Sequence, residues 1–279
     1  CHNQSLRLDP DCTSTWIQKG KALYALGELD LAISCLDRAL RLDETNKEAW
    51  SLRGYASYKL GRDQEAVVCF DKAIELDPEN DDLYLSRGML MRGIGDAAQA
   101  LADFERALDI NPNNSEAWTE KGEVLDEQGK VDEALDCYER AIDANPRNEI
   151  AHKDKGLALL KIDMAEEALG TFEMALEAKP GYQDAWAGKG KALSALGDHY
   201  EATGSLYRAL LKDKSHAEAW FTMGSIFHDF GKVAESVRCY AKALEHDEVA
   251  SIPWVDMGTA LYESGRREDA LICYDRALG

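Results

Sequence analysis

The chain repeats one short pattern every 34 residues. An aromatic residue is followed four positions later by a glycine, always at the same phase of the period. The pattern occurs as Trp16-x3-Gly20, Trp50-x3-Gly54, Tyr84-x3-Gly88, Trp118-x3-Gly122, Trp186-x3-Gly190, Trp220-x3-Gly224 and Trp254-x3-Gly258, with His152-x3-Gly156 in the remaining slot. A fixed period of this size is typical of stacked repeat arrays, in which each repeat buries its apolar face against its neighbours. The regular positions of such an array are occupied by packing residues. An array therefore usually offers a binding surface to partners and rarely carries a catalytic site.

Each period predicts two helices joined by a turn. In residues 47–80 a first stripe of small and aromatic side chains follows helical spacing until Gly61 interrupts it. A second apolar stripe begins near Ala66 and ends at Asp77-Pro78, because proline cannot continue a helix. The next helix can then be capped by an asparagine, at Asn46, Asn80, Asn114 and Asn148. No stretch alternates like a strand, so we predict an all-α protein built of helix pairs.

A glycine in the middle of every first helix costs about 1 kcal/mol relative to alanine, so its recurrence requires a compensating contact. An alanine follows 12 positions later in seven of the eight repeats, as Ala66 follows Gly54, and Ser236 takes this place in the seventh repeat. We expect the glycine to face this alanine, which lets the two helices approach closely. We expect the large residue four positions beyond the alanine to fill the space between neighbours.

In their order, the aromatic residue, the two glycines, the alanine, the large residue and the proline resemble the tetratricopeptide repeat (TPR) family. The resemblance covers Thr13 to Gly279, and residues 1–12 look like the tail of a preceding, truncated repeat. The eight copies are expected at 13–46, 47–80, 81–114, 115–148, 149–182, 183–216, 217–250 and 251–279. The resemblance implies a right-handed α-solenoid, a superhelix of antiparallel helix pairs. It also implies that the first helices line a concave groove that holds a peptide or a partner's helix.

Two kinds of departure from the family pattern are visible. Asp163 replaces the turn glycine of the fifth repeat. The terminal proline is replaced in three repeats, by Glu44, Lys214 and Glu248. We predict that these three joints run on into a longer helix.

The composition limits the kind of partner. The chain has 52 Asp and Glu against 32 Lys and Arg, which gives a net charge of -20. Such a surface repels phosphate backbones and anionic lipid, so we expect neither nucleic acid nor a membrane surface as a partner. No apolar run is long enough to insert into a membrane. A basic or apolar protein segment is favoured, although the charge is also explained if it only keeps an extended array soluble.

The cysteines indicate a reducing compartment. Six of the seven share one repeat position, at Cys1, Cys35, Cys69, Cys137, Cys239 and Cys273. Equivalent positions in stacked helix pairs are about 10 Å apart, whereas a disulfide needs Cα atoms closer than about 7 Å. We therefore predict free thiols and a cytoplasmic location. No signal peptide is seen, and the chain begins at Cys1 inside a repeat, so its N-terminus looks truncated.

The sequence predicts no catalytic residue, cofactor or metal. Gly188-x-Gly190-Lys191 lacks the spacing of a nucleotide motif and lies inside a predicted helix. The six histidines are scattered without a metal-binding motif, and His152 fills a slot that tryptophan holds elsewhere. No pair of cysteines has the spacing of a zinc site. We therefore predict that the chain is not an enzyme.

Helical periodicity shows which first-helix side chains point away from the second helices. An aromatic and aliphatic patch with one cation is predicted at Leu52, Tyr55, Tyr58, Leu85, Met89 and Arg92. A neighbouring acidic wall is predicted at Glu120, Glu123, Asp126 and Glu127. The matching partner is a protein or peptide with apolar anchors and basic residues. The family's chaperone clamp needs lysines paired with asparagines, and Lys21 and Lys153 lack these asparagines.

These observations favour a non-enzymatic scaffold that binds a peptide or helix in its groove. Two alternatives stay open. In the first, the chain is a self-associating oligomerisation module that stacks through its ends or its grooves; end-to-end stacking is expected at Leu271, Tyr274 and Leu278, which no capping helix follows. In the second, it is a regulatory or substrate-recruiting arm of a larger enzyme.

Overall fold

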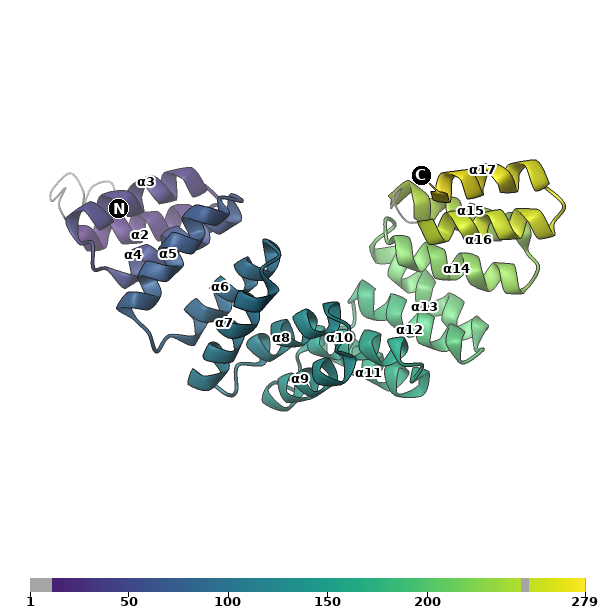
Figure 1. Ribbon diagram of the computed structural model, residues 1–279, viewed down its shortest axis with the longest axis horizontal. Helices are drawn as coiled ribbons and strands as arrows, with labels where there is room; N and C mark the ends of the chain where they lie inside the picture. The colour runs from purple at the N-terminus through teal and green to yellow at the C-terminus, as the bar shows by residue number, and fades with distance from the viewer. Residues whose placement is uncertain (1–11, 247–250, 279) are drawn as a thin grey trace. The chain divides into compact units, whose positions relative to one another are not determined.

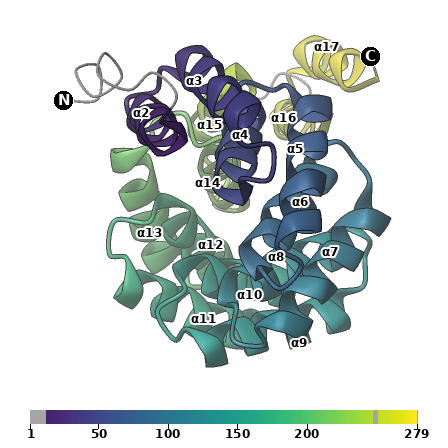
Figure 2. The ribbon, with the colours of Figure 1, turned by 90° about the vertical axis from the view of Figure 1, so that its left-hand side faces the viewer.

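The computed structural model describes residues 12–246 and 251–278, and all regular structure in these ranges is helical (Figure 1). Sixteen helices are described in these ranges, and they alternate in direction along the chain as antiparallel pairs (Figure 1 and Figure 2). The chain divides into two compact units, Cys1–Ala144 and Asn145–Gly279. The prediction of an all-α solenoid of helix pairs is confirmed. The predicted tail at residues 1–12 lies outside the described residues except for Cys12.

Each unit contains four helix pairs. In unit 1 the first helices are α2 (Thr13–Ala25), α4 (Lys47–Lys59), α6 (Asp81–Gly93) and α8 (Ser115–Glu127). Their second helices are α3 (Leu29–Leu42), α5 (Asp63–Leu76), α7 (Ala97–Ile110) and α9 (Val131–Ala144). In unit 2 the first helices are α10 (Glu149–Lys161), α12 (Gln183–Ala195), α14 (Ala217–Asp229) and α16 (Ser251–Glu263). Their second helices are α11 (Ala165–Ala178), α13 (His199–Lys212), α15 (Val233–His246) and α17 (Arg267–Leu278).

The first helices form a layer of their own in each unit. Besides packing on its own second helix, α2 contacts α4, and α6 contacts α8. In unit 2 the same contacts join α10 to α12, α12 to α14 and α14 to α16. Side chains from several repeats are therefore brought together on the first-helix side.

Three of the four predicted asparagine caps are present. The side chains of Asn46, Asn114 and Asn148 accept hydrogen bonds from backbone N–H groups in the first turn of the helix that follows. The prediction is wrong at Asn80, whose side chain makes no such bond. Its amide instead donates to the carboxylate of Asp77 at 3.4 Å.

The prediction of longer helices at joints without proline is wrong where it can be examined. Helix α3 ends before Glu44 and α13 ends before Lys214, whereas Glu248 lies outside the described residues. The Asp43 carboxylate accepts a hydrogen bond from the backbone N–H of Thr45 at 3.1 Å, and Asp213 accepts one from Ser215 at 2.9 Å. The hydroxyls of Thr45 and Ser215 also donate to these carboxylates, and the hydroxyl bonds, together with the backbone bonds, lower the pKa of both carboxyls. Aspartate thus ends these helices with a local turn that competes with helical hydrogen bonds.

In several repeats the residue at the aromatic position bonds the first helix to the joint that precedes it. The indole N–H of Trp50 donates to the backbone carbonyl of Glu44 at 2.8 Å. The same bond joins Trp118 to Pro112, Trp186 to Pro180 and Trp220 to Lys214. In the fifth repeat a ring nitrogen of His152 lies 3.1 Å from the carbonyl of Pro146. This explains why histidine can occupy the tryptophan slot.

The expected partner of the mid-helix glycine is wrong. In all eight repeats a Cβ added to this glycine would lie nearest to the large residue 16 positions later and not to the alanine. A Cβ on Gly122, for example, would lie 2.6 Å from the ring of Tyr138. The glycine therefore makes room for an aromatic or leucine side chain that is itself buried against the first helix.

An ion pair links each of several first helices to the second helix before it. Arg53 pairs with Asp37 at 2.7 Å and Arg87 with Asp71 at 2.6 Å. The same spacing of 16 residues joins Lys121 to Glu105 and Lys189 to Glu173. Arg87 also binds the carboxylate of Asp103 through two of its nitrogens, at 2.9 and 2.6 Å. This second carboxylate is only 3% exposed.

The turn of the fifth repeat keeps its conformation without glycine. Asp163 has a φ of 60°, in the left-handed region where the turn glycines of the other repeats also lie. Asparagine and aspartate tolerate this region better than other side chains. The departure from the family pattern is therefore local.

The six cysteines that the structure describes have free thiols. Five are buried on second helices, whereas Cys12 is half-buried at the start of α2. Burial raises the pKa of the five buried thiols, and raises that of Cys239 to about 11. Since the thiolate is the reactive form, we expect iodoacetamide at mildly alkaline pH to modify Cys12 much faster than Cys239 in the folded protein. Peptide mapping by mass spectrometry checks this, with urea-unfolded protein as the control, and equal rates in the folded protein would contradict it.

Candidate functional site

The aromatic and aliphatic residues predicted for the groove lie around one hollow in unit 1, of about 340 Å³. We call it the tyrosine hollow. It is lined by the predicted residues Tyr55, Tyr58, Leu85 and Met89, and also by Tyr24, Lys59, Asp82, Ser86 and Glu116. These residues come from the first helices of four successive repeats, α2, α4, α6 and α8. The hollow is therefore a property of the array and not of any one repeat.

Tyr55 is held in place from two sides. Its ring meets the ring of Phe70 edge-on, with 5.3 Å between the ring centres. Its hydroxyl accepts a hydrogen bond from the hydroxyl of Ser86 at 2.9 Å. Burial raises the pKa of the Tyr55 phenol. Tyr58, in contrast, is exposed, so the hollow combines one fixed ring with one accessible ring.

Helical spacing predicts that the two leucines, Leu52 and Leu85, face the groove, but both are partly or fully covered by neighbouring repeats. Leu85 is buried, and it packs in a core cluster with Phe104 while also lining the hollow. Leu52 is half-buried and packs against the core cluster that contains Ile17 and Leu36. It does not line the hollow. Leu85 therefore shapes a wall of the hollow, whereas Leu52 serves the packing between repeats.

Tyr24 and Lys59 add a cation and a third ring. The ammonium of Lys59 lies 4.5 Å from the centre of the Tyr24 ring, within the range of a cation–π contact. Tyr24 lies 34 residues before Tyr58, at the same position of the repeat. The 34-residue period therefore contained the signal that could have found Tyr24.

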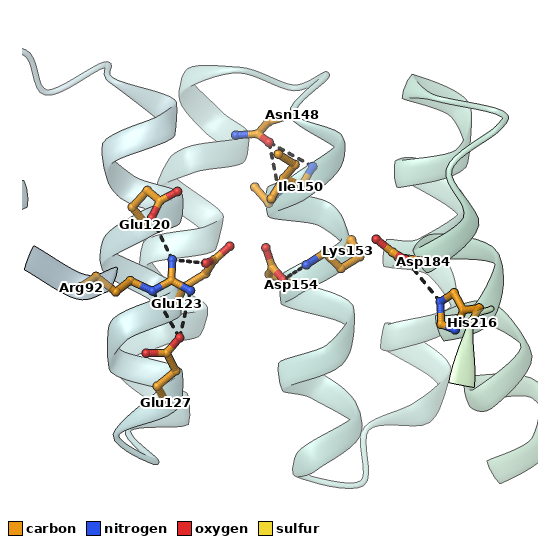
Figure 3. A network of polar contacts seen from close by, with 11 residues as sticks. Arg92, Glu120, Glu123, Glu127, Asn148, Ile150, Lys153, Asp154, Asp184 and His216 are labelled. Carbon is orange, nitrogen blue, oxygen red and sulfur yellow. Dashed lines mark hydrogen bonds and ion pairs between the residues drawn. The ribbon is translucent and has the colours of Figure 1, made fainter. Parts of the chain in front are cut away.

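Arg92 and the acidic wall form a single network (Figure 3). The guanidinium of Arg92 on α6 lies 2.8 Å from Glu120 and 2.9 Å from Glu127, and it also pairs with Glu123. Helical spacing indicated a separate charge anchor at Arg92, but its guanidinium is engaged within the chain. Asp126, on the same helix as the three glutamates, is half-buried. One cation against three carboxylates leaves the network net negative.

The network is partly shielded from water. The side chain of Glu120 is 16% exposed, and burial together with the nearby charge of Glu123 raises its pKa. For Arg92, burial opposes the charged form, but the three carboxylates outweigh it and raise the pKa. The acidic wall is therefore ordered by a cation and is not a set of freely moving carboxylates.

Acidic groups also border the tyrosine hollow itself. Asp82 and Glu116 line it, and Lys59 is the one cation among its lining residues. Aromatic faces attract cations, and nearby carboxylates add to this attraction. The hollow is therefore suited to an apolar side chain next to a basic one.

The glycines of Gly188-x-Gly190-Lys191 are packing residues. A Cβ on Gly188 would lie 2.3 Å from the ring of Phe172, and one on Gly190 would lie 2.6 Å from Leu206. Among residues 12–246 and 251–278, no group of three metal-binding side chains is placed to hold an ion. In the same ranges, no helix is both long and apolar enough to cross a membrane.

Comparison with protein families places the repeats in one class. Profiles described as tetratricopeptide repeat match residues 48–80 and 217–248. A further profile of that description matches residues 85–149, 119–183 and 153–218, and one described as TPR repeat matches residues 20–61. No curated protein matches the chain in sequence.

Solved structures of repeat proteins resemble the chain. The crystal structure of YrrB, described as a TPR protein with an unusual peptide-binding site, is 25% identical, with a TM-score of 0.53; the match covers 66% of this chain and 95% of YrrB. MamA is 26% identical with a TM-score of 0.54, over 60% of this chain and 92% of its own. A chain of the APC/C hetero-tetramer Cut9–Hcn1 is 13% identical with a TM-score of 0.72, over 96% of this chain and 53% of its own, and supports the fold alone.

Proposed function

Because the chain belongs to the tetratricopeptide repeat family, we propose that it is a non-enzymatic scaffold that holds a segment of a partner protein against the first helices of unit 1. Repeat arrays of this family generally serve protein interaction. The observation that carries the proposal is the tyrosine hollow, where four successive first helices supply three tyrosines and an acidic border. YrrB, which is similar in sequence and fold, is described as having a peptide-binding site.

The partner segment has an aromatic or aliphatic anchor next to Lys or Arg. The anchor enters between Tyr55 and Tyr58, where little side-chain freedom is lost because the Tyr55 ring is already fixed. The basic residue lies toward Asp82 and Glu116, or toward the carboxylates that surround Arg92. Aromatic contacts set most of the affinity, whereas the carboxylates act mainly on the association rate and its dependence on salt.

The cysteines bear on the location of the protein. The free thiols of the six described cysteines favour a reducing, cytoplasmic location. Self-association at the chain ends and a role as the arm of an enzyme stay predictions from the sequence.

Replacing both hollow tyrosines tests the proposal. The probes are fluorescent peptides that carry Phe or Leu beside two lysines, compared with the same peptides carrying two glutamates. We expect the basic peptides to bind, and Tyr55→Ala combined with Tyr58→Ala to weaken binding by about 2 kcal/mol. Fluorescence anisotropy at low and high salt measures this.

The matched control is Tyr262→Ala, because Tyr262 is an exposed tyrosine at the same repeat position as Tyr58. This variant is expected to bind the peptides like the parent. Glu116→Gln is expected to weaken binding at low salt and to have less effect at high salt. If the double tyrosine variant binds as tightly as the parent, or if no basic peptide binds, the groove assignment is wrong.

A further inference from the structure

The outward face of α13 in unit 2 carries an apolar stripe. Tyr200, Gly204, Tyr207 and Leu211 follow one another at helical spacing, and we call them the α13 stripe. Tyr200 is 87% exposed, Tyr207 58% and Leu211 59%. Single exposed apolar residues are ordinary, but a line of them along three turns of one helix leaves a continuous uncovered surface.

The other repeats show that the fold does not require this stripe. The position of Tyr207 is acidic in all five preceding repeats, as Asp37, Asp71, Glu105, Glu139 and Glu173. The position of Leu211 is charged in the same repeats, as Arg41, Glu75, Asp109, Asp143 and Glu177. The second helix therefore folds and packs with charged residues at these two positions. Packing within the chain does not account for the tyrosine and leucine that replace them in α13.

The replacement of an acidic residue by Tyr207 also interrupts the series of ion pairs between repeats. The residue 16 positions after Tyr207, where a cation stands in earlier repeats, is Met223. Both residues line a hollow of about 800 Å³ between α13 and α14. Met223 is buried, whereas Tyr207 keeps more than half of its surface exposed. The ion pair of the earlier repeats is therefore absent here, and most of the Tyr207 side chain stays uncovered.

The middle of the stripe is open. Gly204 lies between the two tyrosines and lines the same hollow. A Cβ built on Gly204 would meet no atom within 4 Å. The aromatic ring of Phe230, 57% exposed, borders the hollow from the turn after α14. A flat side chain from outside can therefore lie directly over the glycine.

We propose that a second copy of this chain covers the α13 stripe with its own α13, in an antiparallel, two-fold symmetric pair. When the axis passes midway along the stripe, Tyr207 of each copy lies over Gly204 of the other, and Tyr200 lies against Leu211. Each large side chain meets a small or flexible one, and glycine lets the two helices approach closely. A two-fold pair needs a surface that complements itself. The stripe does so in the size of its side chains, because each large side chain faces a smaller or more flexible one of the other copy.

Charge follows the same symmetry. Glu201 and Arg208 are seven residues apart, so they lie on the same side of α13 beside the stripe, and both are exposed. Among the described residues neither has an ion-pair partner within 4.0 Å, and the Arg208 guanidinium lies 4.6 Å from the centre of the Trp186 ring. The two-fold axis brings Glu201 of each copy beside Arg208 of the other, which forms two equal ion pairs. A second copy supplies both the complementary side-chain sizes and the opposite charges through the two-fold axis, whereas an unrelated partner would have to match them separately. A second copy is therefore favoured.

The first test changes the centre of the stripe. Sedimentation equilibrium of the 279-residue chain is expected to show a dimer, and Tyr207→Glu is expected to weaken it by about tenfold or more. Since Glu173 and Glu139 hold the same position in their repeats, this variant is expected to keep its fold and melting temperature. Val68→Glu is the control, because Val68 is an exposed residue at the position of Gly204 in the second repeat, and this variant is expected to dimerise like the parent.

The second test examines the predicted register. Glu201→Arg alone and Arg208→Glu alone are each expected to weaken the dimer, and the double variant is expected to restore it, because the two charges exchange places across the axis. A parent chain that stays monomeric, a Tyr207→Glu variant that dimerises normally, or a double variant that stays weak would each overturn the proposal. The tyrosine hollow is not involved, so the variant with Tyr55→Ala and Tyr58→Ala is expected to dimerise like the parent.

Discussion

Asp103→Ala is expected to lower the free energy of unfolding by about 3 kcal/mol, because it leaves a largely buried guanidinium without its main partner. The Asp103 carboxylate is 3% exposed and holds Arg87 through two hydrogen bonds. It also accepts a hydrogen bond from the side chain of Gln99 at 3.0 Å. The hydrogen bonds to Asp103, more than any other contact, raise the pKa of Arg87. Urea unfolding followed by circular dichroism measures the loss.

Asp71→Ala is the matched control. Asp71 binds the same guanidinium at 2.6 Å, but its side chain is 46% exposed. Water can replace an exposed partner, so we expect a loss of less than about 1 kcal/mol. Equal losses for the two variants would show that burial of Asp103 does not strengthen the interaction with Arg87.

Gly188→Ala is expected to destabilise unit 2 by about 2 kcal/mol, because the added methyl group meets a ring that has no free side. The Phe172 ring lies between Gly156 of its own repeat and Gly188 of the next. A Cβ on Gly188 would come within 2.3 Å of this ring, and one on Gly156 within 2.8 Å. The ring cannot move away from one helix without moving into the other. Thermal unfolding followed by circular dichroism is the measurement.

Gly170→Ala tests the same chemical change without the contact. Gly170 lies within α11 and is exposed, and a Cβ there would meet no atom within 4 Å. Alanine favours a helix over glycine by about 1 kcal/mol, so this variant is expected to be more stable than the parent. The two substitutions therefore have opposite signs. A stabilising effect of Gly188→Ala would show that Phe172 is not confined.

Helix pairs could be predicted from the period because the apolar stripes and the turn residues recur together. Gly61 follows the end of α4 at Lys59, and Pro78 follows the end of α5 at Leu76, as the pattern indicates. At Glu44 and Lys214 the second helices end without a proline, so the absence of proline does not indicate a longer helix. Aspartate followed two positions later by Thr or Ser carries the same information, through a hydrogen bond that the apolar pattern does not contain.

The sequence predicts which face of each first helix carries the site, but not which side chains contact one another between helices. Helical periodicity put Tyr55, Tyr58 and Met89 on one face, and all three line the tyrosine hollow. It could not show that Arg92 spans from α6 to the glutamates of α8, since this depends on the distance between two helices. The depth at which Leu85 lies also depends on packing between repeats, which a single helix pattern does not describe. The partner-binding role of these residues stays a proposal.

The bond between the tryptophan indole and the joint makes the joints tolerant of substitution. A backbone carbonyl accepts this bond whatever side chain the residue carries, and Glu44, Pro112 and Lys214 all serve. Mutations at the joints can therefore accumulate with little effect on how the first helix is fastened. The connecting loops of such a protein can change in sequence, and gain or lose contacts with other molecules, while the helix pairs that they join keep their arrangement.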